Sequence, residues 1–184
     1  CVCVLNTVSP ELRYFNVRKV LESTTLEQAV TTLRASKRDR PNNCTIVSPQ
    51  GPAHLEVTCG SVGVVRPSET AESGDEGDLN SLRPGRLLHT NHYLDKDLAH
   101  LNSQYPEIIQ SVPRLERAAL LADEFQQANQ RRRTASSDGQ LGVEDLQALL
   151  RDHEGHPRSI CRHPNSDEDT GEWITVRPAL LHSE

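Results

Sequence analysis

The side chains best suited to chemistry lie in residues 86–94, where His89, Thr90 and His92 surround Asn91. Apolar residues lead into this polar group, and Pro84-Gly85 precedes it, so the pattern predicts a short buried strand that leaves a turn. An amide held at a strand end can donate a hydrogen bond to the oxyanion that develops during acyl transfer. The structural alternative is a strand end whose polar groups satisfy neighbouring backbone.

The same region contains residues of metal-binding types. His89, His92 and His100 together with a cysteine could in principle bind zinc, but the chain contains neither Cys-x-x-Cys nor His-Glu-x-x-His. We therefore predict no metal ion and no cofactor. For His89 and His92, hydrogen bonds that orient the backbone are expected rather than acid–base work.

The composition indicates one domain that carries polar insertions. Of the 184 residues, 35% are hydrophobic and 3% aromatic, which is below the usual apolar content of about 45–50%. The deficit is concentrated in residues 67–81 and 127–139, which have the composition of solvated loops. The remainder has the pattern of an ordinary globular chain.

Several classes of partner and location are disfavoured. The formal charge of −6 argues against nucleic acid as the main partner, since phosphate binding needs a basic face. No apolar run approaches the roughly 20 residues of a membrane span. Five cysteines at irregular spacing favour reduced thiols in an intracellular, cytoplasmic protein, and the ending His182-Ser183-Glu184 is not a peroxisomal address.

Periodicity and turn signals place the elements that would position the motif. Helices are expected over residues 10–22, from Thr24 to about 35, 113–128 and 143–153; Thr24 with Glu27 fits a capping box. Strands are expected over residues 1–8, 44–48, 54–58 and 61–65, with a hairpin turn at 49–52 and a further strand at 158–161.

Four segments together resemble a known family. His89-Thr90-Asn91-His92 is similar to a motif of the isopenicillin-N acyltransferase family, also called the acyl-coenzyme A:6-aminopenicillanic acid acyltransferase family, whose members are N-terminal-nucleophile (Ntn) hydrolases. The other three segments follow in the family's order and are residues 18–29, the strand pair 43–47 and 53–57, and residues 156–162.

The resemblance implies a fold and a chemistry. The fold would be α+β, a four-layer αββα sandwich in which helices cover two stacked antiparallel sheets, with residues 1–184 supplying the later part of a single domain. The activity would be acyl transfer or amide hydrolysis through the thioester of an N-terminal cysteine exposed by autoproteolysis. Substrates would be a small amide, a peptide or an acyl-CoA, and the partner the chain's own processed N-terminal subunit. Asn91 would donate to the oxyanion, and Glu56 matches an acidic position that could be structural, in the pocket wall, or catalytic.

The nucleophile is the open point of this interpretation. The chain has no Met and begins with Cys1, so it is expected to be a processed subunit or a fragment. Cys1 could be the nucleophile of a shortened enzyme, because its α-amine (pKa near ~8) could take the thiol proton. We expect instead that Cys1 is an ordinary strand residue and that the nucleophile is missing. A non-catalytic homologue acting as an interaction module is the competing class.

Overall fold

The computed structural model describes residues 3–5, 18–38, 41–67, 86–104, 108–131 and 142–163, with the backbone alone at 3–5, 104, 108 and 109. The chain divides into two compact units, residues 1–108 and 109–184, each described here by itself. Cys1 and most of the two polar insertions lie outside the described residues.

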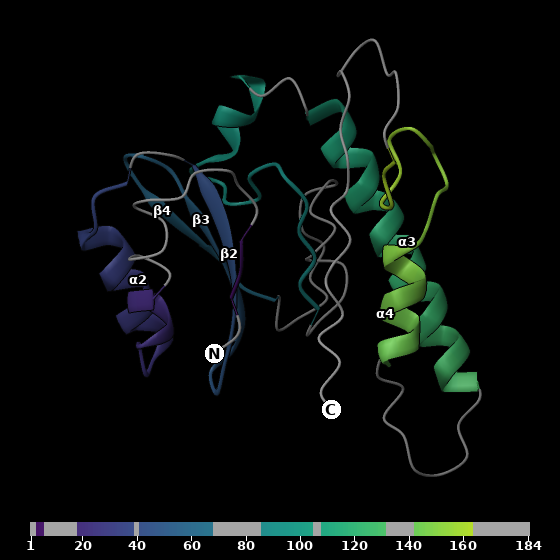
Figure 1. The fold of residues 1–184 in the computed structure, drawn as a ribbon, viewed down its shortest axis with the longest axis horizontal. Coiled ribbons are helices and arrows are strands. Elements are labelled where there is room, and N and C mark those ends of the chain that lie inside the picture. Colours follow the sequence, from purple (N-terminus) through teal and green to yellow (C-terminus); the bar gives the residue numbers. More distant parts are fainter. Residues whose placement is uncertain are drawn as a thin grey trace. The chain divides into compact units, whose positions relative to one another are not determined.

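Unit 1 contains an antiparallel sheet in the order β1-β2-β3-β4 (Figure 1). The strands are β1 (Cys3–Leu5), β2 (Asn42–Ser48), β3 (Gly51–Val57) and β4 (Val62–Val65). The predicted hairpin is present, and its turn is Pro49-Gln50 between the paired residues Ser48 and Gly51. Gly51 has φ +94°, in the left-handed region that glycine enters without a steric penalty.

The register of β2 and β3 separates an apolar face from a polar one. Cys44 pairs with Leu55 and Ile46 with Ala53, whereas Asn43 pairs with Glu56 and Thr45 with His54. Side chains alternate between the two faces of a strand, so Glu56 and His54 lie together on the face opposite Leu55. The central run Ala53–Val57 is nevertheless buried throughout, which means that both faces of β3 are covered.

Helix α2 (Leu26–Ala35) covers the apolar face. Its buried residues pack with those of β2, β3 and β4 in one core cluster: Val20, Leu26, Ala29, Val30, Leu33, Cys44, Ile46, Ala53, Leu55, Val57 and Val62. The helix was predicted in the right place, but its N-cap is one residue later than expected. The Thr25 hydroxyl accepts from the amide of Gln28 (3.1 Å), and the Gln28 side chain accepts from the amide of Thr24 (2.8 Å).

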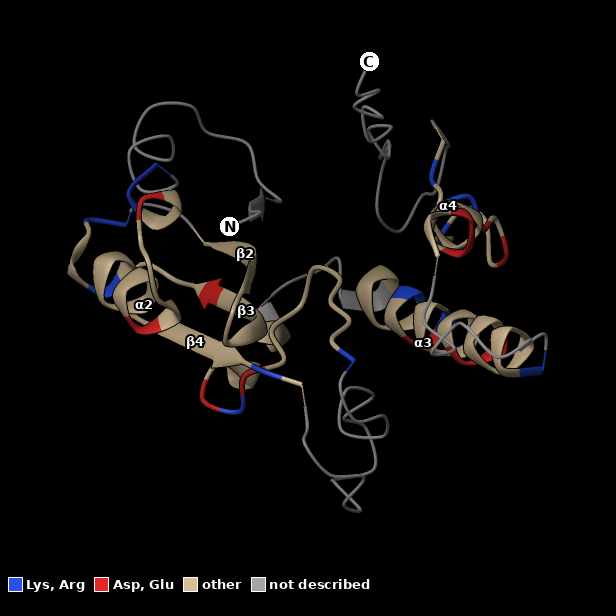
Figure 2. Cartoon of the chain, turned by 90° about the horizontal axis from the view of Figure 1, so that it is seen from below, with Lys and Arg blue, Asp and Glu red and all other residues tan. Residues whose placement is uncertain are grey.

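Unit 2 is built on two helices, α3 (Ile108–Arg131) and α4 (Val143–Leu150). Their small core contains Ala118, Leu121, Ala122 and Leu149, with Phe125 and Ile160 packed against it. Helix α3 starts at Ile108 rather than at Pro113, which lies inside it, and it continues through residues 127–131, which were expected to be loop. Acidic and basic side chains are interspersed along α3 rather than separated by sign (Figure 2).

Two predicted strands are wrong. Residues 86–94 form no strand, because side-chain carboxylates, rather than a neighbouring strand, accept hydrogen bonds from backbone amides in this region. Residues 158–161 form turns and bends, in which the amide of Cys161 donates to the carbonyl of Asp152 (2.8 Å). The expectation of reduced thiols is wrong for Cys44, which is disulfide-bonded, whereas Cys59 and Cys161 are free.

The α+β class is confirmed by this arrangement of one antiparallel sheet with helices. A short 3₁₀ helix, η1 (Ala99–Gln104), completes the described elements of unit 1. Within the described part of the chain, every helix is too short or too polar to cross a bilayer.

Candidate functional site

The polar face of the sheet holds the predicted motif through one buried carboxylate. We call residues 86–98 the motif loop. Glu56, completely buried on β3, accepts hydrogen bonds from the amides of Leu94 (2.7 Å) and Asp95 (2.9 Å) and from Nε2 of His89 (2.7 Å). Both carboxylate oxygens are therefore occupied, and Glu56 fixes the loop on either side of Asn91.

His89 and Glu56 form a buried ion pair. Nε2 of His89 meets the Glu56 carboxylate, and Nδ1 meets the backbone carbonyl of Thr90. Both ring nitrogens of His89 therefore face groups that accept hydrogen bonds. The prediction that His89 orients the backbone agrees with this geometry.

His54 lies beside this pair and stays neutral. Its ring centroid is 4.7 Å from that of His89, and its Nδ1 is hydrogen-bonded to the Thr45 hydroxyl (2.9 Å). Burial, and then repulsion from His89, lower the pKa of His54 to about 3. Its Nε2 has no hydrogen-bond partner. The sequence analysis did not single out His54, although its position two residues before Glu56 in a strand places both on one face.

Two further side chains hold the far end of the motif loop. The Asp95 carboxylate accepts from the amide of Val64 on β4 (3.2 Å), directly over Gly63, where a Cβ atom would come within 2.7 Å of the carboxyl carbon. The Asn102 side chain both accepts from the amide of Tyr93 and donates to its carbonyl, each at 2.8 Å. Residues 93–95 are thus bound through main chain and side chain.

The predicted oxyanion donor lies in this anchored stretch. Asn91 is exposed, whereas His92 is buried and its Nδ1 is hydrogen-bonded to the Thr90 hydroxyl (3.2 Å). Asn91 is therefore the most exposed of the four motif residues and is accessible to solvent or a substrate. Glu56 and His89 are enclosed and fully hydrogen-bonded, which favours the structural role for Glu56 over the catalytic one.

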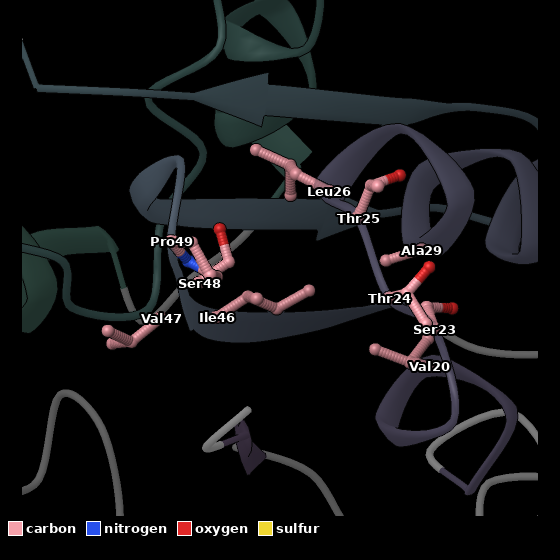
Figure 3. A pocket seen from close by; sticks show the side chains of 10 residues that line it. All are labelled: Val20, Ser23, Thr24, Thr25, Leu26, Ala29, Ile46, Val47, Ser48 and Pro49. Atoms are coloured by element: carbon pink, nitrogen blue, oxygen red, sulfur yellow. The ribbon is translucent and has the colours of Figure 1, made fainter.

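A cavity of about 120 Å³ lies on the other face of the sheet, between the start of α2 and β2 (Figure 3). Its wall combines the hydroxyls of Ser23, Thr24, Thr25 and Ser48 with apolar groups of Val20, Leu26, Ala29, Ile46, Val47 and Pro49. Binding pockets for cofactor-sized molecules typically have about 300–1,000 Å³. This cavity is too small for an acyl-CoA, and it is separated from Asn91 by the sheet.

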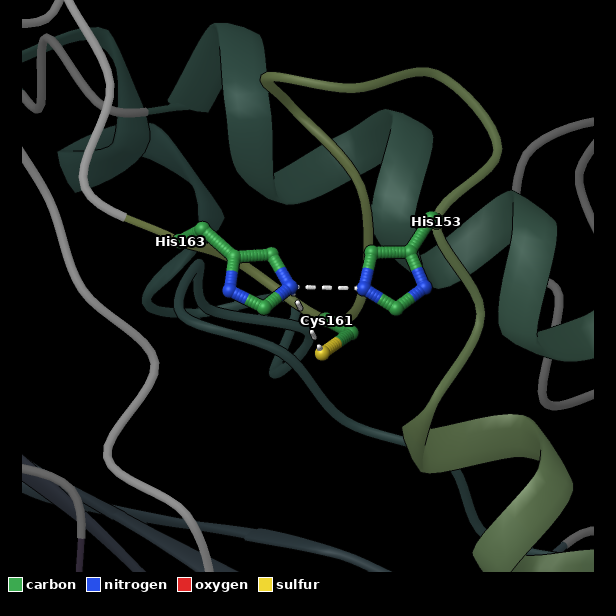
Figure 4. Close-up of side chains that lie close together, drawn as sticks. All are labelled: His153, Cys161 and His163. Atoms are coloured by element: carbon green, nitrogen blue, oxygen red, sulfur yellow. Dashed lines mark hydrogen bonds between the residues drawn. The ribbon is translucent and has the colours of Figure 1, made fainter.

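The structure brings together three side chains of metal-binding types, a cluster that the sequence analysis missed. His153, Cys161 and His163 offer ligand atoms that all lie within 4.8 Å of one another in unit 2 (Figure 4). The set weighed from the sequence, His89, His92 and His100, is not such a group. The sequence pattern that could have indicated this cluster is Cys161-x-His163, preceded by His153 just after α4.

Comparison with known proteins gives one family. The family model described as "Acyl-coenzyme A:6-aminopenicillanic acid acyl-transferase" matches residues 2–177, which span both units. No curated protein matches the chain.

Proposed function

Because the chain belongs to the acyl-coenzyme A:6-aminopenicillanic acid acyltransferase family, we propose that it contributes the oxyanion-binding part of a cysteine-dependent acyltransferase or amide hydrolase. The observation that carries the proposal is Asn91, an exposed amide on a loop that buried Glu56 fixes to the sheet. Donors held in place before the reaction stabilise developing charge without a reorganisation cost.

The proposed reaction proceeds through a thioester. The thiolate of an N-terminal cysteine, exposed by autoproteolysis, attacks the carbonyl carbon of an amide, a peptide or an acyl-CoA. The Asn91 amide donates to the resulting oxyanion, and the protonated α-amine supplies the proton to the leaving group. An acceptor amine or water then attacks the thioester, so that transfer or hydrolysis releases the acyl group and regenerates the thiolate.

The nucleophile is proposed to be a cysteine other than the three whose side chains are described. Cys44 is disulfide-bonded, and Cys59 and Cys161 lie inside the chain, whereas the proposed mechanism uses the thiol of an N-terminal cysteine. We propose the four-layer αββα sandwich as the complete fold, with β1–β4 as part of one of its two sheets and a processed N-terminal subunit as partner.

The test of Asn91 is a matched pair of variants in the natural full-length protein, assayed for turnover of thioester and amide substrates. Asn91→Ala is expected to lower kcat by about 10²–10³-fold, the usual effect of losing one oxyanion donor. Lys96→Ala, on the same loop and also exposed, is the control and should retain full turnover. Equal activity in both variants would refute the role of Asn91.

The identity of the nucleophile is tested by N-terminal sequencing and intact mass of the mature protein, together with Cys1→Ala. A subunit that starts at Cys1 and loses its acyl-enzyme in Cys1→Ala would make Cys1 the nucleophile. Unchanged turnover in Cys1→Ala would exclude it.

A further inference from the structure

A second site is formed in unit 2, where the chain folds back after α4. Nε2 of His153 lies 2.7 Å from Nε2 of His163, and the latter lies 3.9 Å from Sγ of Cys161 (Figure 4). The two imidazole rings are stacked, with centroids 4.9 Å apart and planes 9° from parallel. Cys161 is a free thiol, and both histidines are exposed.

The turn that joins these residues is anchored at several points. The amide of Cys161 donates to the carbonyl of Asp152 (2.8 Å), which holds the two arms of the turn together. The Asp152 carboxylate receives two hydrogen bonds from Arg117 of α3 (3.1 and 2.7 Å), so His153 follows a fixed residue. Ile160, just before Cys161, packs on the core of unit 2. The fold of this anchored turn therefore brings the three side chains together.

We propose that His153, Cys161 and His163 bind one zinc ion through the two Nε2 atoms and the Cys161 thiolate, with the fourth position open to water or to an external ligand. Two imidazoles and a thiolate are a ligand set that suits borderline-soft ions such as Zn²⁺. An open fourth position is the usual feature of zinc sites that bind or activate another molecule.

The observed spacings are close to those of a tetrahedral zinc site. With Zn–N of about 2.0–2.1 Å and Zn–S of about 2.3 Å, a tetrahedral arrangement sets the two nitrogens about 3.3 Å apart and each nitrogen about 3.6 Å from sulfur. From the 2.7 and 3.9 Å found, the two Nε2 atoms would separate by about 0.6 Å, and Sγ of Cys161 would approach Nε2 of His163 by about 0.3 Å. Side-chain rotation of exposed histidines can supply such shifts.

Binding changes the protons held by the cluster in a definite way. At 2.7 Å, one Nε2 donates to the other, so at least one of them carries a hydrogen. When both Nε2 atoms bind the ion, the donating ring passes its hydrogen from Nε2 to Nδ1 through solvent, so each neutral ring then carries its hydrogen on Nδ1, and the Cys161 thiol releases its proton to solvent. Zinc binding at this site therefore releases protons, as is general for thiolate and imidazole ligands.

The first experiment uses the wild-type full-length chain and Zn²⁺ alone, after treatment with a chelator. Thiol alkylation followed by mass spectrometry compares Cys161 with Cys59, an exposed thiol outside the cluster that serves as an internal control. Equimolar Zn²⁺ is expected to slow alkylation of Cys161 by about tenfold or more and to leave Cys59 unchanged. Alkylation of both at the same rate with and without Zn²⁺ would overturn the proposal.

The second experiment measures stoichiometry and affinity against a chromophoric zinc chelator. Wild type is expected to bind one Zn²⁺ more tightly than His163→Ala and Cys161→Ser by at least about tenfold, since even partners that only orient ligands contribute about 10–100-fold. His100→Ala, which removes an exposed histidine of unit 1, should bind like wild type. Equal binding by all four proteins would refute the site, and circular dichroism of the metal-free variants checks that they fold.

Discussion

Glu56 carries a negative charge in the interior of unit 1, where an unpaired carboxylate would be strongly destabilising. Three donors compensate it, two from the backbone and one from His89, so a single side chain joins the sheet to the motif loop. An amide could not replace it, because its nitrogen would face one of those donors. The position of the loop that carries Asn91 therefore depends on Glu56.

Glu56→Gln is expected to lower the free energy of unfolding by about 3–5 kcal/mol, the usual consequence of removing one partner of a buried ion pair. Urea denaturation measures it. Glu27→Gln, which changes an exposed glutamate of α2, should stay within about 0.5 kcal/mol of wild type. Similar midpoints for the two variants would mean that Glu56 does not anchor the loop.

His54 predicts a pH dependence of stability. Its pKa is about 3 in the folded protein and near 6.5 in the unfolded chain. Between these values the unfolded chain binds a proton that the folded protein does not, so the neutral ring's contribution is complete above pH 6.5 and is lost as pH falls toward 3. The loss from this group is at most about 1.4 kcal/mol per pH unit.

Denaturation midpoints at pH 7, 6 and 5 test this prediction. His54→Gln should flatten the decline in stability between pH 6.5 and 5, a window above the range in which most carboxylates titrate. His100→Gln, on the surface of η1, should leave the decline as it is in wild type. An unchanged slope in His54→Gln would contradict the assignment of His54 as neutral when folded.

At this scale the sequence predicted types of residue better than their partners. The contact of His89 with the backbone was predicted from one short motif, and the oxyanion role of Asn91 stays a prediction. The bonds from Glu56 to residues 89, 94 and 95 instead join positions 33, 38 and 39 apart. A pattern of neighbouring residues does not predict contacts between positions so far apart in the sequence. The cluster of His153, Cys161 and His163 was missed for the same reason, since a turn brings His153 to the other two.

At the scale of elements, the motif loop replaces the predicted strand and is seated against the edge of β4. The close approach of Asp95 to Gly63 makes glycine necessary there for space, because a methyl group would meet the Asp95 side chain at 2.7–2.8 Å. Gly63 of β4 pairs with Glu56 of β3. Because Gly63 has no side chain, the carboxylates of Glu56 and Asp95 both have room at this position.

Gly63→Ala is expected to destabilise unit 1 by about 1–3 kcal/mol, the range found when an atom is added to a well-packed place. Gly60→Ala is the matched control, since its Cβ would meet nothing within 4 Å and its φ is not positive. Thermal unfolding of the two variants measures the difference. If Gly63→Ala melted no lower than Gly60→Ala, Asp95 would not be seated as described.

Local sequence signals predicted the positions of most helices and strands, but they predicted the first and last residues of these elements less well. Helix α2, the β2–β3 hairpin and α4 occur where periodicity and turn residues placed them. Helix α3 was predicted too short because Pro113 was taken as its first residue, although the helix tolerates it within. The strand at 86–94 was wrong because side-chain acceptors compete with strand pairing, which periodicity does not reveal.

At the scale of the whole molecule, the described residues form two apolar cores, one in each compact unit. The core of unit 1 joins a helix to three strands, whereas that of unit 2 depends on few side chains from α3 and α4. The family match at residues 2–177 spans both units. The single domain expected from the sequence remains a prediction.

Because each unit has its own apolar core, we predict that the two units unfold locally and independently of one another. Leu149→Ala removes a buried side chain of α4 and should cost about 2 kcal/mol or more in unit 2. Hydrogen exchange should then accelerate for amides of α3 and α4 and stay unchanged for those of β2 and β3. Leu146→Ala, on the same helix but exposed, is the control. Equal acceleration in both units would show one cooperative domain.

The bonds between Glu56 and the motif loop close a long stretch of chain that includes the polar insertion after β4. The entropy of closing such a stretch rises only with the logarithm of its length, so doubling it costs about 0.6 kcal/mol. The geometry at Asn91 depends on the two ends of the stretch and not on its length. A change of tens of residues in this stretch is therefore expected to leave the Asn91 side chain in the same place.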